Sequence, residues 1–314
     1  MARNIVIGVP AYRGWPWLSD ALRSIQNQTH RDFEVRISVD GSDERSAECC
    51  RPFLADPRFQ MIVQQTRLGW IGNANWLISR AGRDYFCYHQ QDDLIEPSYY
   101  ETLVAQAERE PEAAAVYSDV RWIGARQAVE AQPTIRGAPI ERVLAQIANM
   151  HWIPFLGLIR SEAVAAAGLL RFTLPDSYSE DVVWIARLAL GGHLVRVPQV
   201  LYLKRLHEDC THTKWFKWTL EQKRVAWIRM CLGLLRAGLR AAQTDAERAR
   251  VLFAVRDRLI NNSDRRALVQ PTHDAGAQRL TKDFLAQAEQ EGICTVRRSD
   301  QGHVIVQTGP AAFN

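Results

Sequence analysis

Two acids, Asp92 and Asp93, lie side by side directly after the strand-like run DYFCYH at 84–89. Adjacent carboxylates repel each other, so they must be hydrated, neutralised by a proton or a cation, or fully exposed. At a strand end they could hold a hard divalent cation, Mg²⁺ or Mn²⁺, whose other ligands would be water and phosphates. They could equally form a solvated turn that caps the helix after Pro97. The acid pair therefore indicates either a metal site or a turn.

Three further positions carry side chains suited to proton transfer or polar binding. Asp40 could accept a hydrogen bond from a nucleotide base or a ribose, or close an Asx-turn with Gly41. Asp181, beside Glu180, could be a general base, but acids are also common in the first turn of a helix. His207 could be a further metal ligand or an ordinary surface histidine.

Apolar runs of strand length alternate with helical patterns over the first 115 residues. The strands are expected at 5–9, 32–39, 59–65 and 84–89, and the helices at 15–28, 69–82 and 98–110. This alternation is typical of βαβ units and a largely parallel sheet. In such a sheet ligands bind outside the carboxyl ends of the strands.

The residues that follow these strands are Tyr12, Asp40, Arg67 and the Asp92-Asp93 pair. The strand exits thus bring an aromatic ring, an acid, a cation and an acid pair to one edge. Tyr12 and Arg67 are uninformative on their own, since a tyrosine can complete a core and an arginine can pair with an acid. Taken together, these residues at one edge indicate a binding site more strongly than any one of them does alone.

The composition indicates a globular chain. Its 314 residues are 47% hydrophobic, enough for one large domain or two modest ones. The net charge of +4 suits phosphate-bearing substrates or an anionic membrane face, but the basic residues are scattered, which disfavours nucleic acid. Six cysteines without CxxC or zinc spacing favour a reducing, cytoplasmic compartment. We expect neither a membrane span nor a signal peptide.

In order along residues 4–212, these motifs resemble an inverting family-2 glycosyltransferase of the GT-A fold. The resemblance is carried by VPAY at 9–12, VDGSD at 39–43, the acid-rich segment 67–97, SEDVVWIARLALGG at 179–192 and YLKRLHEDCTH at 202–212. It implies an α/β GT-A domain over 1–212, with a nucleotide-binding half at 1–115 and an acceptor-binding half at 116–212. A mainly helical region follows at 213–314, and its tail is expected to form a β-hairpin around Ser299–Gly302.

The resemblance also implies a role for each matching residue. Asp181 would be the catalytic base, with Glu180 as an acceptor contact. Asp93 would be the more direct metal ligand, Asp92 a sugar or ribose contact that also faces the metal, and His207 a further metal or diphosphate contact. The nucleotide and its diphosphate would be bound by Pro10, Tyr12, Asp40, Arg67 and Asn73.

The implied reaction is a metal-assisted single displacement that uses Mn²⁺ or Mg²⁺. A sugar would pass from a nucleoside-diphosphate donor to a glycan, lipid-linked or other hydroxyl acceptor, in surface polysaccharide or glycoconjugate synthesis. The chain departs from the family pattern at Gln90, where an acid is usual two residues before the pair, and at Val39, where an Asp usually precedes Asp40. Both departures bear on donor choice and on the strength of metal binding.

Other functions compete with this one. A sugar-phosphate nucleotidylyltransferase or a Rossmann dehydrogenase needs a Gly-rich phosphate loop after the first strand, and VPAYRGWPW at 9–17 has none. A non-catalytic sugar-nucleotide or glycan-binding protein with a degenerate transferase fold is the remaining alternative, because a binding module need not keep the catalytic acids.

The C-terminal region carries an apolar stripe beside basic residues. The stripe could lie on the inner face of the cell membrane, where lipid-linked acceptors reside, or pack on the catalytic domain or on a second subunit. It consists of Trp215, Trp218, Trp227, Ile228, Leu232, Leu235 and Leu239.

Overall fold

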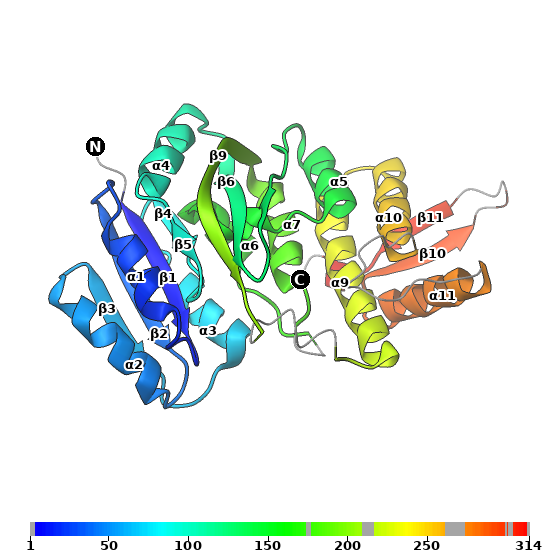
Figure 1. The fold of residues 1–314 in the computed structure, drawn as a ribbon. Helices are drawn as coiled ribbons and strands as arrows, with labels where there is room; N and C mark the ends of the chain where they lie inside the picture. Colours follow the sequence, from blue (N-terminus) through cyan, green and yellow to red (C-terminus); the bar gives the residue numbers. More distant parts are fainter. Residues whose placement is uncertain are drawn as a thin grey trace. The chain divides into compact units, whose positions relative to one another are not determined.

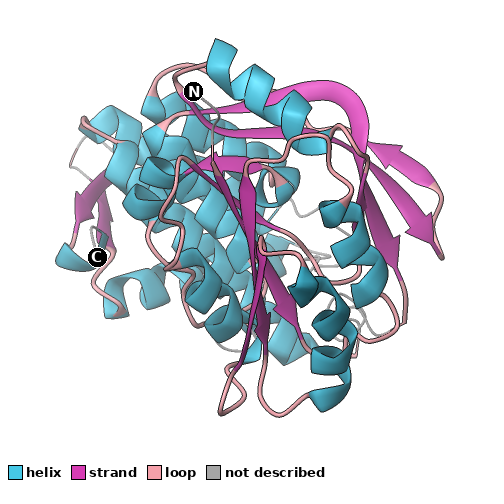
Figure 2. Cartoon of the chain, turned by 90° about the vertical axis from the view of Figure 1, so that its left-hand side faces the viewer, coloured by secondary structure: helices cyan, strands magenta, loops and turns pink. Residues whose placement is uncertain are grey.

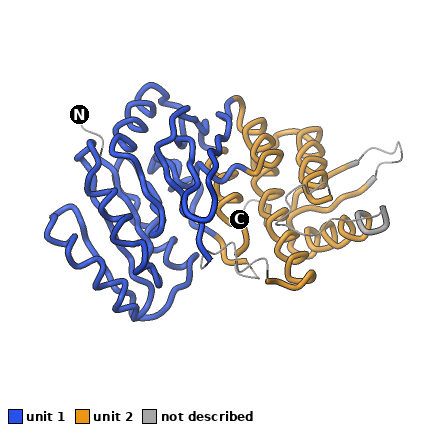
Figure 3. The backbone as a smooth tube through the Cα atoms, viewed as in Figure 1, with its two compact units in different colours: residues 1–136, 151–170, 191–208 blue, residues 137–150, 171–190, 209–314 orange. Residues whose placement is uncertain are grey.

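A computed structural model gives the fold, and it describes residues 4–173, 177–208, 217–260, 274–298, 300 and 304–312. Contacts divide the chain into two compact units, coloured blue and orange in Figure 3. Unit 1 consists of residues 1–136, 151–170 and 191–208, and unit 2 of residues 137–150, 171–190 and 209–314. Two segments of the expected acceptor half, 137–150 and 171–190, thus group with the C-terminal region. The functional boundaries expected from the sequence stay a prediction.

Unit 1 is built on a nine-stranded sheet, which is twisted as Figure 2 shows in magenta. In sheet order its strands are β3 (Phe59–Val63), β2 (Phe33–Val39), β1 (Ile5–Ala11), β4 (Tyr85–Tyr88), β8 (Leu158–Arg160), β6 (Ala113–Gly124), β9 (His193–Leu206) and β5 (Leu94–Ile95), while β7 (Ala128–Glu130) pairs with β6.

Most of these strands point the same way. β1 is parallel to β2 and β4, and β6 is parallel to β9. β8 is antiparallel to both β4 and β6, so β4 and β6 share one direction. The expected mostly parallel α/β sheet is therefore confirmed. The carboxyl ends of β1, β2, β4, β6 and β9 lie at one edge of this sheet.

The helices of unit 1 pack on this sheet because one side of each is apolar. In α1 the buried residues Leu18, Ala21, Leu22 and Ile25 recur at helical spacing. At Gly8 of β1 an added Cβ would lie 3.0 Å from Leu77 Cβ, so glycine permits close packing against α3. The helices are α1 (Leu18–Gln26), α2 (Glu44–Cys50), α3 (Gly69–Ile78), α4 (Tyr99–Arg109) and α6 (Ser161–Ala167), with 3₁₀ turns η1 (Arg51–Ala55) and η2 (Ile153–Leu156).

Unit 2 is mainly helical and includes an antiparallel hairpin, as expected for the C-terminal region (Figure 1). Its elements are α5 (Pro139–Asn149), α7 (Glu180–Gly191), α9 (Leu220–Ala241), α10 (Asp245–Ile260), α11 (Asp274–Gln290), β10 (Cys294–Arg298), β11 (Val304–Thr308) and η3 (Pro310–Ala312). Ser299 and Gly302, where the turn was expected, lie outside the described residues.

The apolar stripe on α9 is buried rather than exposed. Its members from Trp227 to Leu239 are all less than a tenth exposed, and α9 packs on α5, α10 and α11 of its own unit. The part of the stripe from Trp227 to Leu239 is therefore core and presents no surface to a membrane. Trp218, which precedes α9, is half-buried. Trp215 lies outside the described residues. None of the helices in the described part of the chain is both long and apolar enough to cross a bilayer.

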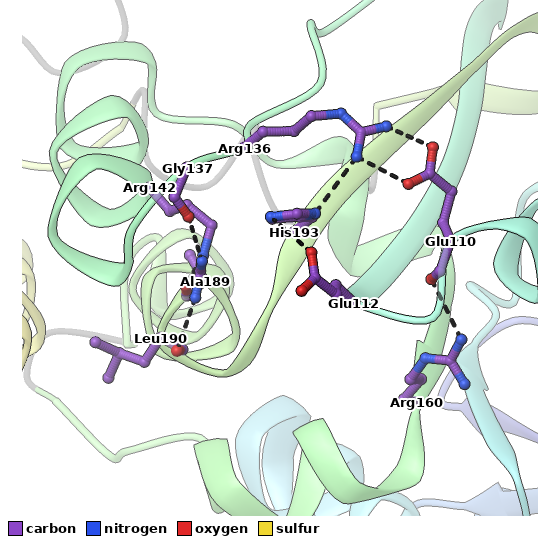
Figure 4. A network of polar contacts seen from close by, with 9 residues as sticks. All are labelled: Glu110, Glu112, Arg136, Gly137, Arg142, Arg160, Ala189, Leu190 and His193. Carbon is purple, nitrogen blue, oxygen red and sulfur yellow. Dashed lines mark hydrogen bonds and ion pairs between the residues drawn. The ribbon is translucent and has the colours of Figure 1, made fainter.

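Arginine side chains bond to the carbonyls at a helix end and to an acid, as Figure 4 shows. In unit 2, Arg142 of α5 donates from Nε to Ala189 O at 2.7 Å and from Nη2 to Leu190 O at 3.0 Å. These carbonyls end α7 and have no partner within the helix, so Arg142 caps it. Within unit 1, Arg136 pairs with Glu110 and lies 3.4 Å from His193 Nδ1.

Candidate functional site

The exit of β1 is tied to the segment that carries the acid pair. Tyr12 N donates to Gln91 Oε1 at 2.8 Å, and Gln91 Nε2 donates back to Tyr12 O at 3.0 Å. At Gly14 an added Cβ would lie 2.3 Å from Gln91 Oε1, so a side chain there would displace the Gln91 amide from its position beside Tyr12. The guanidinium of Arg67 lies 4.2 Å from the centre of the Tyr12 ring. The structure thus brings Tyr12, Arg67 and the acid-pair segment together.

Asp40 and Asn73 hold α3 in place. The Asp40 carboxylate accepts hydrogen bonds from Leu68 N and from Gly69 N, the latter at 2.9 Å, at the start of α3. Asn73 Nδ2 donates to Ser38 O of β2 at 3.0 Å, and both side chains are buried. Pro10, on β1, is half-buried at the same sheet edge. Direct contacts of these three residues with a nucleotide stay a prediction.

The Asp93 carboxylate is fully buried and surrounded by donors from β9. It accepts from the Tyr202 hydroxyl at 2.9 Å, from Lys204 Nζ at 3.3 Å and from Arg205 N at 2.8 Å. Burial raises the pKa of Asp93 to about 6, and the charge of Lys204 opposes that rise. Both oxygens of Asp93 are therefore used within the protein.

Asp92 has a different environment. Its Oδ2 lies 2.9 Å from His207 Nε2, and the two side chains are 17% and 20% exposed. Burial acts to raise the pKa of Asp92, but the hydrogen bond with His207 and the charge of Lys204 outweigh it and lower the pKa below its ordinary value. Arg205 Nε donates to Asp92 O at 3.0 Å, and its guanidinium lies 4.4 Å from the centre of the Trp17 ring.

The Asp92 and His207 side chains fit a divalent cation shared with a ligand. One carboxylate and one imidazole are acceptable to Mn²⁺, and a cation bound with phosphates and waters needs few protein ligands. Among the described residues no group of three His, Cys, Asp or Glu side chains forms a complete cage. The arrangement fits a cation that takes its remaining ligands from a diphosphate and water.

Asp181 and Glu180 begin α7 in unit 2. Glu180 is 3% exposed, and its Oε1 accepts from Arg187 Nη2 at 2.9 Å and from Arg171 N at 2.8 Å. Burial raises the pKa of Glu180 to about 7, although Arg187 opposes the rise. Burial also lowers the pKa of Arg187 to about 10. Glu180 is therefore held in a buried pair, while the next residue, Asp181, is half-buried in the same first turn.

Sequence reasoning assigned no role to Gln91, Lys204, Arg205 or Trp17, although all four contact the predicted site. A weak signal existed in the basic segment KRLH at 204–207, which contains two of them. Gln91 had no such signal, because its importance depends on a backbone 79 positions earlier.

The chain resembles known glycosyltransferases in sequence. The family model described as glycosyl transferase family 2 matches residues 6–162. Glycosyltransferase GlyG of Streptococcus pneumoniae is 29% identical over 109 residues, which are 34% of this chain and 36% of that protein. An uncharacterized glycosyltransferase of Haemophilus influenzae is 24% identical over 217 residues, 65% of each chain. The chain thus matches about a third of GlyG and less than two thirds of the second relative.

Solved structures share the fold. S. aureus TarS, residues 1–349, superposes with a TM-score of 0.61 at 13% identity over 98% of this chain and 97% of that one, and has also been solved with UDP-GlcNAc. A mannosyltransferase from Pyrobaculum calidifontis in complex with GDP-Man and Mn²⁺ superposes with a TM-score of 0.56 at 13% identity, over 93% of this chain and 76% of that one. These likenesses confirm the expected GT-A type fold.

The Lys204–Asp93 pair predicts a stability change. Lys204→Met should lower the free energy of unfolding by about 3 kcal/mol, because it leaves a buried carboxylate without a counter-charge. Asp93→Asn in the same chain should restore much of that loss. Denaturant unfolding followed by circular dichroism measures both, with Lys282→Met on the exposed side of α11 as the control. Strict additivity of the two changes would contradict a direct interaction.

Glu180 predicts a pH dependence of stability. Its pKa is about 7 in the folded chain against an ordinary 4.5, so between these values the folded chain keeps a proton that the unfolded chain releases. The stability that this proton provides is complete below pH 4.5 and is lost as the pH rises through 7. Relative to Glu180→Gln, the wild type should therefore lose up to about 3 kcal/mol across this window. Parallel pH profiles would refute the assignment, and Glu162→Gln, an exposed acid, is the control.

Proposed function

Because the chain belongs to glycosyltransferase family 2, we propose that it is an inverting enzyme that moves a sugar from a nucleoside-diphosphate donor to an acceptor hydroxyl. The observation that carries the proposal is the Asp92–His207 pair, 2.9 Å apart at the carboxyl edge of the sheet. Its neighbour Gln91 is bonded to Tyr12, on which Arg67 stacks. Charged side chains suited to a metal-bound diphosphate and an aromatic ring suited to a nucleotide base thus lie along one edge of the sheet.

The nucleotide end of the donor would lie at the exits of β1 and β2. Tyr12 offers an aromatic face for the base, and Arg67 offers a guanidinium suited to phosphate oxygens. Asp40 and Asn73 would act by fixing α3 as the wall of this region, since their side chains already bond to the backbone there. The complexes of the two structural relatives with UDP-GlcNAc and with GDP-Man support a nucleotide-sugar donor.

We assign the metal contact to Asp92 and His207, and a positioning role to Asp93. This differs from the expectation that Asp93 is the more direct ligand, because β9 already uses both Asp93 oxygens. A Mn²⁺ or Mg²⁺ ion, when bound, would offset the charge that develops on the departing diphosphate. Asp93 keeps β9 and the acid-pair segment in register, so that Asp92 faces His207.

Asp181 would accept the proton of the acceptor hydroxyl. The freed oxygen forms a bond to the anomeric carbon of the sugar as the bond from that carbon to the diphosphate oxygen breaks, and the electron pair leaves with the nucleoside diphosphate. One backside displacement inverts the configuration. We assign Glu180 to holding the first turn of α7 rather than to the acceptor, because the side chain is buried and its Oε1 already accepts from Arg187 and from Arg171 N.

The family resemblance also supports the wider setting that we propose. The acceptor would be a glycan or lipid-linked hydroxyl, used in surface polysaccharide or glycoconjugate synthesis. The site of action would be the cytoplasm or the inner face of the cell membrane, with surfaces of the C-terminal helices other than the buried stripe in contact with the membrane or a second subunit.

Donor turnover tests the function. With UDP-GlcNAc or GDP-Man and Mn²⁺, we expect a raised melting temperature and release of nucleoside diphosphate. Asp181→Asn should lower the rate at least about 100-fold and leave the donor-induced thermal shift unchanged, because a base acts in the transition state. Asp245→Asn, an exposed acid in the first turn of α10, is the matched control. Saccharide binding without turnover of any donor would favour the non-catalytic alternative.

Direct metal binding tests the assignment of Asp92 and His207. Mn²⁺ affinity in the presence of UDP, measured by electron paramagnetic resonance, should fall at least about 10-fold in Asp92→Asn and in His207→Gln. His193→Gln, a half-buried histidine elsewhere on β9, should bind Mn²⁺ as the wild type does. EDTA should reduce the thermal shift that the donor produces. Unchanged affinity in both ligand variants would show that the metal is held by other residues.

A further inference from the structure

Two tryptophans lie next to the Asp93–Lys204 pair and have no role in the function proposed so far. The ring centres of Trp122 and Trp152 are 5.6 Å apart, with 53° between their planes. Lys204 Nζ lies 5.9 Å from the centre of the first ring and 5.7 Å from that of the second. One buried ammonium therefore links the acid pair to an aromatic pair.

The sheet puts these tryptophans at the edge where the strand exits gather. Trp122 stands near the carboxyl end of β6 and pairs in register with Lys204 of β9. β6 runs in the same direction as β4, which precedes the acid pair. In the strand order β1 and β2 lie on one side of β4, and β6 and β9 lie on the other. The aromatic pair is thus on the far side of the acids from the proposed nucleotide region.

One carboxylate fixes both rings. Glu130 of β7 accepts from Trp122 Nε1 at 3.0 Å and from Trp152 Nε1 at 2.8 Å. Gln132 Oε1 also accepts from Trp152 N at 3.0 Å. An indole has a single donor, so the polar edges of both rings are satisfied and their orientation is set.

The two rings differ in exposure. Trp122 is 6% exposed and belongs to the core, whereas Trp152 is half-buried and keeps part of its surface accessible. Packing alone would not require a carboxylate shared by two indoles. A ring held at its nitrogen, its backbone and one face is a rigid surface for a ligand.

We propose that Trp152, supported by Trp122 and Glu130, is a stacking subsite for a saccharide unit of the acceptor. The proposal rests on the transferase function and narrows its acceptor to glycans. A pyranose has an apolar C–H face and a rim of hydroxyls, which match an aromatic face with a few polar groups around it. Arg126 supplies such a group, with its guanidinium 4.8 Å from the centre of the Trp122 ring.

Glycoside binding to the full chain tests the subsite. The probes are the methyl glycosides of glucose, galactose, mannose and N-acetylglucosamine at millimolar concentration, observed by saturation-transfer NMR. We expect at least one to bind, and Trp152→Ala to weaken it about 10-fold or more through loss of the ring face. Trp152→Leu keeps more of the side-chain volume at this position but also removes the aromatic face. It tests the subsite if Trp152→Ala does not fold.

Two further variants separate stacking from general damage. Trp76→Ala removes another half-buried tryptophan of unit 1, which stacks under Arg80 at 3.7 Å, and should bind glycosides as the wild type does. Glu130→Gln replaces one accepting oxygen with an amide NH₂, so one indole loses its partner and the loss of affinity should be smaller than in Trp152→Leu.

The outcomes for the subsite and for the transferase function are distinct. Wild-type affinity for glycosides in Trp152→Leu, or no glycoside binding by the wild type, overturns the subsite. Thermal shifts with UDP-GlcNAc and GDP-Man on the same variants should be unchanged from the wild type. If neither donor binds but glycoside binding still depends on Trp152, the transferase function fails and the subsite stands.

Discussion

The buried carboxylate of Asp93 is the constraint on which the candidate site depends. An uncompensated charge at a fully buried position is strongly unfavourable, so the three donors that β9 supplies must be in place whenever unit 1 is folded. This requirement locks the segment after β4 onto β9. It thereby points Asp92 at His207 and holds Lys204 over the Trp122 and Trp152 rings.

Two adjacent acids consequently have opposite properties. Burial raises the pKa of Asp93, which has all its hydrogen bonds within the protein, whereas His207 and Lys204 lower the pKa of the more accessible Asp92. Asp93 holds the candidate site together, and Asp92 is the acid that remains accessible to a ligand. Repulsion within the pair is thus relieved by Lys204 as well as by any cation that the site binds.

In unit 2 the helix that carries Asp181 is fixed at both ends. Glu180 in its first turn forms a buried pair with Arg187 farther along the helix, and Arg142 bonds to the carbonyls at its last turn. The pKa shifts of Glu180 and Arg187 both oppose their charged forms, so this pair is retained at a cost in stability. A rigid first turn is what a general base requires, since its oxygen must be held within reach of a hydroxyl.

The sequence by itself determined the parallel α/β sheet and the family, because alternating apolar periods and ordered short motifs are local patterns. It also placed Tyr12, Arg67 and the acid pair at one edge, since parallel strands bring their exits together. Only the tertiary structure distinguished Asp92 from Asp93, buried the stripe on α9 and joined Trp122 to Trp152. The physical reason is distance along the chain. The side chains that contact the two acids lie on β9 or directly after it, as far as 115 positions away, and a local sequence pattern carries no information on which distant residues meet.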